Sequence, residues 1–269
     1  MESFLAFFEH MPIWMKASWV FIVLAFFWVI EGHYSFRSLT YNKWNHAKTN
    51  LGLLFFVMAI NAVFGIVTVF IFEFTSAQGF GLLYWIPLPQ WLGLLLSILV
   101  LDLIAQYGVH YLLHKVRWMW KLHLVHHSDL HVDASSGTRH HPLDFIIRET
   151  FAVFAVIIMG MPVAYYLLYR ILSVLFTYFT HANLNLGKLD YALTYVFVSP
   201  NMHKFHHHDS LPWTDSNYGN MFSIWDRIFG TFAYGDPSKI TYGLDILDPK
   251  TNQNTAQQLR LPFSYKKKS

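Results

Sequence analysis

The sequence predicts an all-α integral membrane protein, in which a helical bundle of three long spans and a helical hairpin carries a cytosolic, histidine-rich metal-binding cap. Three observations predict this class. The 269 residues are 54% hydrophobic and 19% aromatic but only 13% charged, which is unlike a soluble domain. Apolar runs of about 20 residues, long enough to cross a bilayer as a helix, recur along the chain. Histidines gather just beyond the ends of these runs.

The first three spans follow from the apolar runs in chain order. Residues 11–30 form the first span, with tryptophans near both ends, as is common at membrane interfaces. Residues 51–74 form the second, and residues 75–90 form the turn beyond it, which has no basic residue. The third span is long enough to leave the bilayer while still helical, so it carries His110 and His114 into the interface.

Two further apolar segments predict a helical hairpin, either full or re-entrant. Residues 143–160 and 163–180 are separated by Pro162, and proline interrupts a continuous helix. Basic residues concentrate after the first and the third spans, which puts both of these segments on the cytosolic side by the positive-inside rule. The polar segment from Ser199 onward is therefore expected to be a cytosolic cap.

The composition excludes several kinds of site and partner. The chain has no cysteine, so disulfides, thiolate zinc sites and cysteine-ligated iron–sulfur clusters are excluded, and a metal must be bound through nitrogen and oxygen. The formal net charge is only +3 and the basic residues lie in short loops, so we expect no nucleic-acid partner. The lysines at 266–268 could contact anionic lipid headgroups, and they fit a dilysine retrieval signal if the source is eukaryotic.

Histidines at helical spacing are the strongest chemical signal in the sequence. An HxxxH motif is followed by two HxxHH motifs, and further histidines, including His181, lie between these two. Residues three or four apart project from one face of a helix, so ligand geometry explains this spacing whereas burial does not. Imidazole suits iron, zinc, copper and nickel, and ten ligands are enough for two ions that share a pocket. The expected metal ligands are His110, His114, His123, His126, His127, His141, His181, His203, His206 and His207.

The other histidines are expected to have different roles. Three lie at span ends or in a loop, where interfacial positions are favoured over ligation: His10, His33 and His46. Three more adjoin expected ligands, and each could replace its neighbour or donate a hydrogen bond from behind it: His131, His140 and His208. We leave all six outside the metal set.

Asp102 is a carboxylate within an apolar helix, four residues before Gln106 in a ladder that continues to His110 and His114. It could orient a ligand histidine by accepting the N–H that the metal leaves free. It could equally make a buried polar contact between helices. The charged and amide residues that adjoin the clusters are expected to be structural: Asp129, Asp133, Arg139, Asp215, Asn217, Asp226 and Arg227.

Four motifs between about Leu101 and Phe232 carry a family resemblance: DLIAQYGVHYLLH, WKLHLVHHSDLHVDASSGTRHHPLD, FTHANLNLG and VSPNMHKFHHHDSLPWTDSNYGNMFSIWDRIFGTF. They resemble the fatty acid hydroxylase superfamily, also called the sterol desaturase family. The resemblance implies a di-metal centre, normally of two iron ions, held by the ten histidines given above. This sequence differs from the family pattern at His140, where a bulky apolar residue is common, and at His208, which extends the second HxxHH motif.

The resemblance also implies an activity and a set of partners. The metals would activate O2, the co-substrate, to hydroxylate or desaturate a C–H bond of a lipid such as a fatty acyl chain, a sterol, a sphingolipid or an alkylglycerol. Because the sequence has no flavin fingerprint or haem module, the electrons would come from an external ferredoxin or cytochrome b5-type donor with its reductase. The expected divisions of the chain are N-terminal spans, 1–100, a catalytic domain, 101–235, and a cytosolic tail, 236–269.

Two other functions stay open, and so does the source. A non-redox protein could bind or transport zinc or copper, although transport predicts ligands inside the membrane and these histidines lie beyond the span ends. Haem-mediated electron transfer would need paired axial ligands on facing spans. Zinc could also replace iron during purification. The short chain favours a bacterial protein of the inner membrane, or one of the endoplasmic reticulum if the source is eukaryotic.

Overall fold

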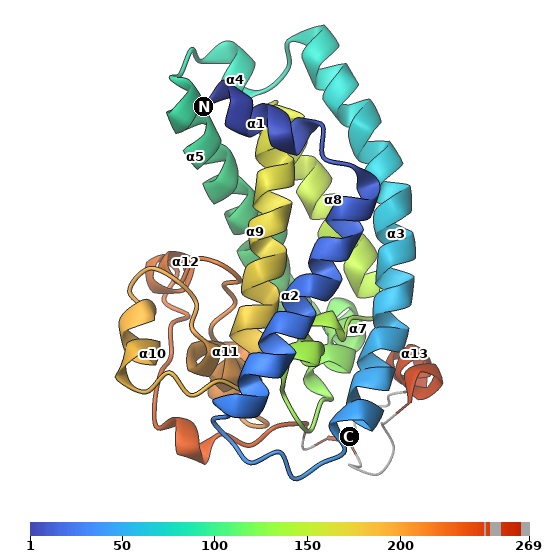
Figure 1. Ribbon diagram of the computed structural model, residues 1–269, viewed down its shortest axis with the longest axis vertical. Helices are drawn as coiled ribbons and strands as arrows, with labels where there is room; N and C mark the ends of the chain where they lie inside the picture. Colours follow the sequence, from blue (N-terminus) through green and yellow to red (C-terminus); the bar gives the residue numbers. More distant parts are fainter. Residues whose placement is uncertain (245, 248–253, 265–269) are drawn as a thin grey trace.

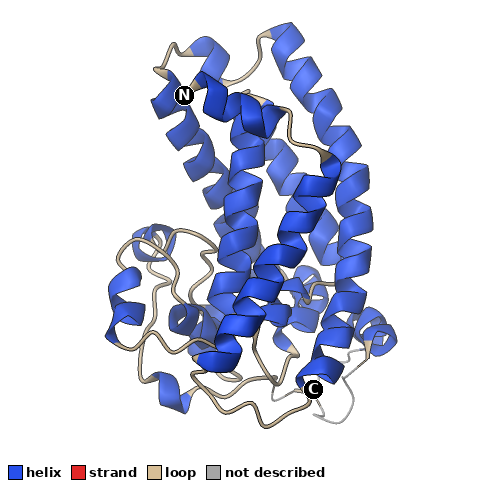
Figure 2. Ribbon diagram, in the orientation of Figure 1, coloured by secondary structure: helices blue, strands red, loops and turns tan. Residues whose placement is uncertain are grey.

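A computed structural model describes residues 1–244, 246–247 and 254–264 of the chain. The described residues form helices and loops without a strand (Figure 2). Four helical stretches are long and apolar enough to cross a membrane: Ile13–His33, Lys43–Trp85, Gln90–Lys115 and Val163–His181. The predicted all-α integral membrane bundle is therefore confirmed. The lysines expected to contact lipid, at 266–268, lie outside the described residues.

The helices divide into a bundle of long spans and a cap at one end of it (Figure 1). The bundle contains α1 (Glu2–Glu9), α2 (Ile13–His33), α3 (Lys43–Gln78), α4 (Leu82–Trp85), α5 (Gln90–Asp102), the π-helix η1 (Leu103–Gly108), α6 (Val109–Lys115), α8 (Pro142–Met159) and α9 (Val163–His181). The cap contains α7 (Arg117–His127), α10 (Lys188–Leu193), α11 (Pro200–His206), α12 (Ile224–Ile228), α13 (Thr255–Ser264) and the short helices η2 (Ala134–Thr138), η3 (Trp213–Asp215) and η4 (Pro237–Lys239).

The third span runs without interruption through α5, η1 and α6, so it crosses the division expected at residue 101. It enters the cap while still helical, as the sequence predicts, and delivers His110 and His114 there. The six residues of η1 are a π-helical segment directly before these histidines. Such segments are uncommon and occur often at functional sites.

The predicted hairpin is formed by α8 and α9. Gly160 ends α8 in the left-handed conformation, with φ of 59°, and Pro162 caps the start of α9. A side chain at Gly160 would also collide with the backbone, since a Cβ there would lie 2.3 Å from the carbonyl oxygen of Phe80. The turn therefore needs glycine for its backbone angles and for close packing. Figure 1 shows α9 in the middle of the bundle, where it returns the chain to the cap.

The second span differs from the prediction at both ends. The sequence predicts a polar loop up to residue 50, but α3 begins at Lys43, where the Asn42 side chain accepts a hydrogen bond from the Asn45 amide at 3.0 Å. This hydrogen bond stabilises the start of the helix about two turns earlier than predicted. The added turns carry His46 and Asn50, which lie in the cap of the protein. At the other end α3 continues to Gln78, so part of the expected turn is helical.

Two apolar cores support the metal-bearing end of the protein. In the bundle, Leu101 of α5 packs with Val156 of α8 and Tyr169 of α9. In the cap, Leu124 of α7 packs with Leu53 and Leu261. Because Leu261 belongs to α13, part of the expected C-terminal tail forms a helix that packs against α3 and α7.

Candidate metal centre

Nine of the ten histidines expected as ligands lie in two groups, and within each group one potential ligand atom per residue lies within 4.8 Å of the others. Group 1 consists of His110, His114, His123, His127 and His206. Group 2 consists of His126, His181, His203 and His207. The groups adjoin, because the ring centroids of neighbouring histidines such as His126 and His127 are 5.5 Å apart.

Each HxxHH motif contributes to both groups. On α7, His123 and His127 are four residues apart and share one face, so both join group 1. His126 points about 100° away from its neighbour His127 around the helix and joins group 2. In the second motif, on α11, the i, i+4 pair His203 and His207 joins group 2, and His206 joins group 1. Each of these two helices therefore supplies histidines to both groups.

The nitrogens of group 2 converge on one point. His181 Nδ1 lies 2.7 Å from the Thr177 carbonyl oxygen, which can only accept, so Nε2 presents a lone pair. This Nε2 lies 3.0 Å from His203 Nε2, 3.2 Å from His126 Nε2 and 3.3 Å from His207 Nε2. One lone pair cannot accept three hydrogen bonds at once. Imidazole nitrogens bound at about 2.0–2.1 Å to one ion would lie roughly 3.0–3.4 Å apart, so the spacing fits a shared metal.

Carbonyl oxygens fix the orientation of two histidines in group 1. His110 Nδ1 donates to the Tyr218 carbonyl oxygen at 2.9 Å, and His206 Nδ1 donates to the Ser216 carbonyl oxygen at 2.7 Å. Each of these contacts leaves Nε2 without its proton and directed into the group. Partners of this kind set the tautomer and the ring orientation of metal-bound histidines.

Asp144 orients a third histidine of group 1. Its Oδ2 accepts from His123 Nδ1 at 2.9 Å, and its Oδ1 accepts from Arg148 Nε at 2.9 Å. The carboxylate is fully buried, so it is held by both partners. The contact joins α8 to α7 at the edge of the metal centre.

Several buried ring nitrogens have no hydrogen-bond partner among the described residues. They are His114 Nε2, both nitrogens of His127, His203 Nδ1, His206 Nε2 and His207 Nδ1. A buried polar atom without a partner costs about 1–3 kcal/mol, so a cluster of them is unexplained by packing alone. Coordination of metal ions would satisfy the inward-facing nitrogens, and nine imidazoles suit two ions.

Burial favours the neutral form of the clustered histidines, and ligation requires that form. Burial, opposed only in part by the Asp144 carboxylate, lowers the pKa of His123 to about 3. Burial, together with the charges of neighbouring imidazoles, also lowers the pKa of His126, His127 and His206 well below its ordinary value. Neutral, converging imidazoles therefore fit a pair of nitrogen-ligated transition metals.

His141 is the one expected ligand that lies outside both groups. It caps α8, where its Nδ1 accepts from the Leu143 amide at 3.2 Å and its Nε2 donates to the Leu259 carbonyl oxygen at 3.2 Å. The preceding residue, His140, points inward instead. Its ring stacks on His126 with centroids 4.6 Å apart, and its Nδ1 lies 3.4 Å from the Asp144 carboxylate.

Asp102 contacts no histidine among the described residues. It accepts hydrogen bonds from Trp225 Nε1 at 2.9 Å, the Phe222 amide at 3.2 Å and the Tyr169 hydroxyl at 3.2 Å. Asp102 therefore makes a buried polar contact between helices, the second role that the sequence left open. Its hydrogen bonds join α5 to α9 and to the cap. His110 lies two helical turns further along the chain.

His46 differs from the interfacial role expected for it. Only 6% of its surface is exposed, and its Nε2 lies 2.7 Å from Asp129 Oδ1 while its Nδ1 lies 3.0 Å from Asp133 Oδ2. Asn50, one turn later on α3, accepts a hydrogen bond from Arg139 at 3.0 Å. The i, i+4 spacing of His46 and Asn50 is the signal that could have revealed this network, had the stretch been recognised as helix.

The remaining histidines lie outside the two groups. His131 stacks on the Tyr41 ring with centroids 4.2 Å apart, and His208 lies 2.9 Å from the Asp209 carboxylate. His10 and His33 are exposed, consistent with positions at the ends of helices.

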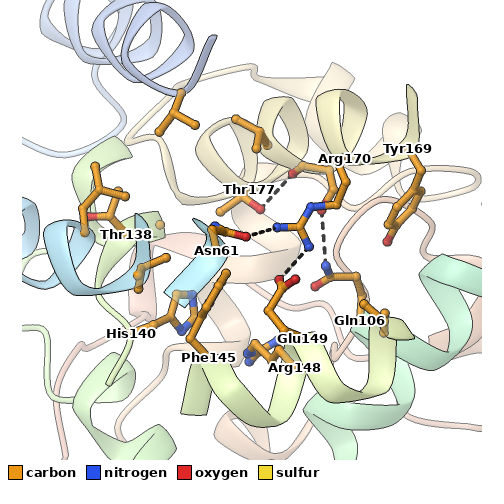
Figure 3. A pocket seen from close by; sticks show the side chains of 18 of the residues that line it. Asn61, Gln106, Thr138, His140, Phe145, Arg148, Glu149, Tyr169, Arg170 and Thr177 are labelled. Carbon is orange, nitrogen blue, oxygen red and sulfur yellow. Dashed lines mark hydrogen bonds and ion pairs between the residues drawn. The ribbon is translucent and has the colours of Figure 1, made fainter. Parts of the chain in front are cut away.

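A cavity of about 130 Å³ adjoins group 2 on its bundle side (Figure 3). It lies between α3, η1, α8 and α9. His140 and Thr177 line its wall, and both contact group 2: the His140 ring stacks on His126, and the Thr177 carbonyl oxygen accepts from His181. The cavity therefore leads from the interior of the bundle to the histidines.

Comparison with known proteins agrees with this arrangement. Residues 94–231 match the fatty acid hydroxylase family. An alkylglycerol monooxygenase of Caenorhabditis elegans is 31% identical over 57% of this chain and 29% of that protein. The ornithine lipid hydroxylase OlsE of Rhizobium tropici is 28% identical over 61% of this chain and 49% of its own. Methylsterol monooxygenase 1 of Gallus gallus is 26% identical over 58% of this chain and 53% of its own.

The chain thus spans about half or less of the length of these relatives. No solved structure matches it. The matched region covers just over half of the chain and contains all nine clustered histidines. This chain belongs to the fatty acid hydroxylase family.

Proposed function

We propose that this protein is a membrane-bound, non-haem di-iron oxygenase that uses O2 to hydroxylate, or in a related reaction desaturate, a C–H bond of a lipid. The observation that carries the proposal is the convergence of nine buried histidines in two adjoining groups. The names of three relatives, which refer to alkylglycerol, ornithine lipid and methylsterol, support a lipid as the substrate.

Each group would hold one iron, with five imidazoles in group 1 and four in group 2. When bound, the two irons supply the oxidising power against an unactivated C–H bond that amino-acid side chains lack. The protein's own residues hold and orient the ligands. Asp144 fixes the ring of His123, and the carbonyl oxygen of Thr177 fixes the ring of His181.

The bundle would supply the lipid and exclude water. Apolar side chains of α3, α8 and α9 form one part of the cavity wall, including Leu54, Ala152 and Val174. A hydrocarbon segment is favourable in such surroundings, and a dry site protects a reactive oxidant. The cavity reaches His140, whose ring stacks on His126 of group 2, and this would bring a C–H bond towards the metals.

The setting and the partners are also part of the proposal. The basic residues that follow the first and third spans favour a cap on the cytosolic side, where a ferredoxin or cytochrome b5-type donor with its reductase could deliver electrons. A bacterial inner membrane is the proposed location, with the endoplasmic reticulum as the eukaryotic equivalent. We assign the reaction to residues 101–235, which contain both histidine groups.

Lipid analysis tests this function. Cells that express the unaltered protein should contain lipid species heavier by one oxygen, or lighter by two hydrogens, that are absent when His126→Ala is expressed. The matched control is His10→Ala, because this histidine is exposed and distant from the groups in sequence. Lipid extracts that are identical for the unaltered protein and His126→Ala would contradict the proposal.

A further inference from the structure

An ion pair between two helices of the bundle lines the cavity beside group 2. Arg170 of α9 donates to Glu149 Oε1 of α8 at 2.6 Å and to Asn61 Oδ1 of α3 at 2.8 Å. Figure 3 shows the guanidinium group between these two partners. All three residues lie near the middle of their helices, where charge in an apolar bundle is costly and usually marks a functional site.

The cavity links this polar cluster to the histidines. Seven residues of α9 separate Arg170 from Thr177, whose carbonyl oxygen accepts from His181, and this corresponds to about 10 Å along a helix. A volume of about 130 Å³ is similar to that of an engineered cavity that holds benzene. Only one end of a lipid can therefore enter, and it would lie a short chain length from the metal centre.

Every charged side chain that lines the cavity is paired, although Asp144, the partner of Arg148, lies outside the lining. Arg170 is paired with Glu149 at 2.6 Å, and Arg148 is paired with Asp144 at 2.9 Å. A carboxylate, a phosphate or an ammonium group would add an uncompensated charge in surroundings of low dielectric constant, which is strongly unfavourable. This pairing of charges therefore selects against lipids with a charged end.

Three hydrogen-bonding atoms in the cavity wall have no hydrogen-bond partner among the described residues. Gln106 donates to Ser173 at 3.2 Å, but its side-chain carbonyl oxygen makes no hydrogen bond among the described residues. The second carboxylate oxygen of Glu149 and the side-chain amide nitrogen of Asn61 also make no hydrogen bond among the described residues. An available acceptor and an available donor match a hydroxyl group, which can donate one hydrogen bond and accept others.

We propose that this cavity binds the uncharged, hydroxyl-bearing end of the lipid substrate. Gln106 accepts the single hydrogen bond that the hydroxyl group donates, and Asn61 donates one to its oxygen. Arg170 holds Glu149 and Asn61 in place and neutralises the carboxylate. The inference rests on the proposed function, since it makes the bound lipid the substrate, but the binding itself requires no metal.

Binding of three lipids with the same chain and different ends tests the inference. Hexadecanol, hexadecanoate and hexadecane are titrated into the metal-free, detergent-solubilised full chain at about pH 8, where the fatty acid is ionised. Hexadecanol is expected to bind at least about tenfold more tightly than the other two. Gln106→Leu should weaken hexadecanol binding by about tenfold, whereas Gln78→Leu, at an exposed end of α3, should leave it unchanged.

Glu149→Gln supplies a second, independent readout. The substitution leaves Arg170 without its counter-charge, so it should reverse the preference and make hexadecanoate the tighter ligand. Hexadecanoate binding as tightly as hexadecanol to the unaltered chain would overturn the inference, and so would a Gln106→Leu variant with unchanged affinities. If thermal melting shows that Glu149→Gln does not fold, the result for Gln106→Leu decides the matter alone.

The experiment separates this inference from the proposed function. A chain that produces oxygenated lipids in cells but prefers hexadecanoate would refute the inference and leave the function standing. A chain that prefers hexadecanol but binds no redox metal would refute the proposed function while the cavity's preference stood.

Discussion

His123 Nδ1 donates to Asp144 Oδ2 at 2.9 Å, so a buried carboxylate of α8 orients a histidine of α7 inside the metal centre. The other oxygen of the same carboxylate accepts from Arg148, which lines the cavity in the bundle. One side chain therefore contacts both a proposed metal ligand and a residue of the cavity wall. Asp144 therefore links the cap to the wall of the proposed lipid site.

Removal of the Asp144 charge is expected to weaken metal binding at group 1. Asp144→Asn keeps the shape of the side chain but weakens its hold on the His123 ring, and losses of about 10–100-fold in metal affinity are typical of such changes. Competition with a chelator, followed by metal analysis, measures the effect. The control is Glu73→Gln on the exposed surface of α3. Equal metal retention by both variants would contradict the role given to Asp144.

The two neighbours His140 and His141 give a test of the ligand set. His141→Ala should keep its full metal content and lose only about 1 kcal/mol of stability, because the residue caps α8. His127→Ala should lose metal from group 1. Metal analysis and thermal melting of both variants separate the two effects. A His141→Ala variant depleted of metal would restore the expectation drawn from the sequence and count against the structural placement.

His46 is expected to matter for stability even though it lies outside both histidine groups. His46→Ala removes the shared partner of Asp129 and Asp133 and leaves two buried carboxylates close together. Loss of one partner from a buried ion pair typically costs about 3–5 kcal/mol. Thermal melting in detergent checks this, with the exposed His33→Ala as the control. Equal melting temperatures for the two variants would argue against the network.

The metal-free protein is expected to lose stability in mild acid. Burial lowers the pKa of His123 to about 3 in the folded chain, whereas an exposed histidine titrates near about 6.5. Between these values the unfolded chain binds the extra proton, so stability is complete above the upper value and falls as the pH decreases. The slope is about 1.4 kcal/mol per pH unit for one such histidine.

Denaturation of metal-free samples at about pH 7 and about pH 5 measures this slope. A variant with both His126→Gln and His127→Gln should show a shallower dependence, because two further buried rings with lowered pKa values are removed. Stability that rises on acidification would mean that the rings are charged in the folded state.

The sequence predicts the membrane class and the nine histidines of the two groups because both depend on local patterns. Apolar length indicates the spans, and i, i+3, i+4 spacing indicates which imidazoles share a face of a helix. The assignment of each histidine to a group depends on how α7 and α11 pack against each other. For this reason His126 and His206 each lie outside the group that holds the i, i+4 pair of their own motif, and spacing alone does not contain that information.

Two departures from the prediction have identifiable causes. His141 caps α8 before Pro142, which turns His140 inward in its place. The start of α3 depends on a side-chain cap at Asn42 within a polar stretch that is typical of a loop, so the burial of His46 was not apparent. Of the two roles left open for Asp102, its position fits the buried polar contact, and spacing could not decide this because partners such as Trp225 come from distant parts of the chain.

Metal content and iron spectroscopy test the central claim most directly. The full chain is expressed in medium enriched in iron-57, purified in detergent and examined by mass spectrometry for metals and by Mössbauer spectroscopy. The account predicts about two irons per chain with an exchange-coupled signal, since group 1 and group 2 each offer enough imidazoles for one ion. Zinc or copper alone, persisting when iron is abundant, would contradict it and favour a metal-binding protein without redox chemistry.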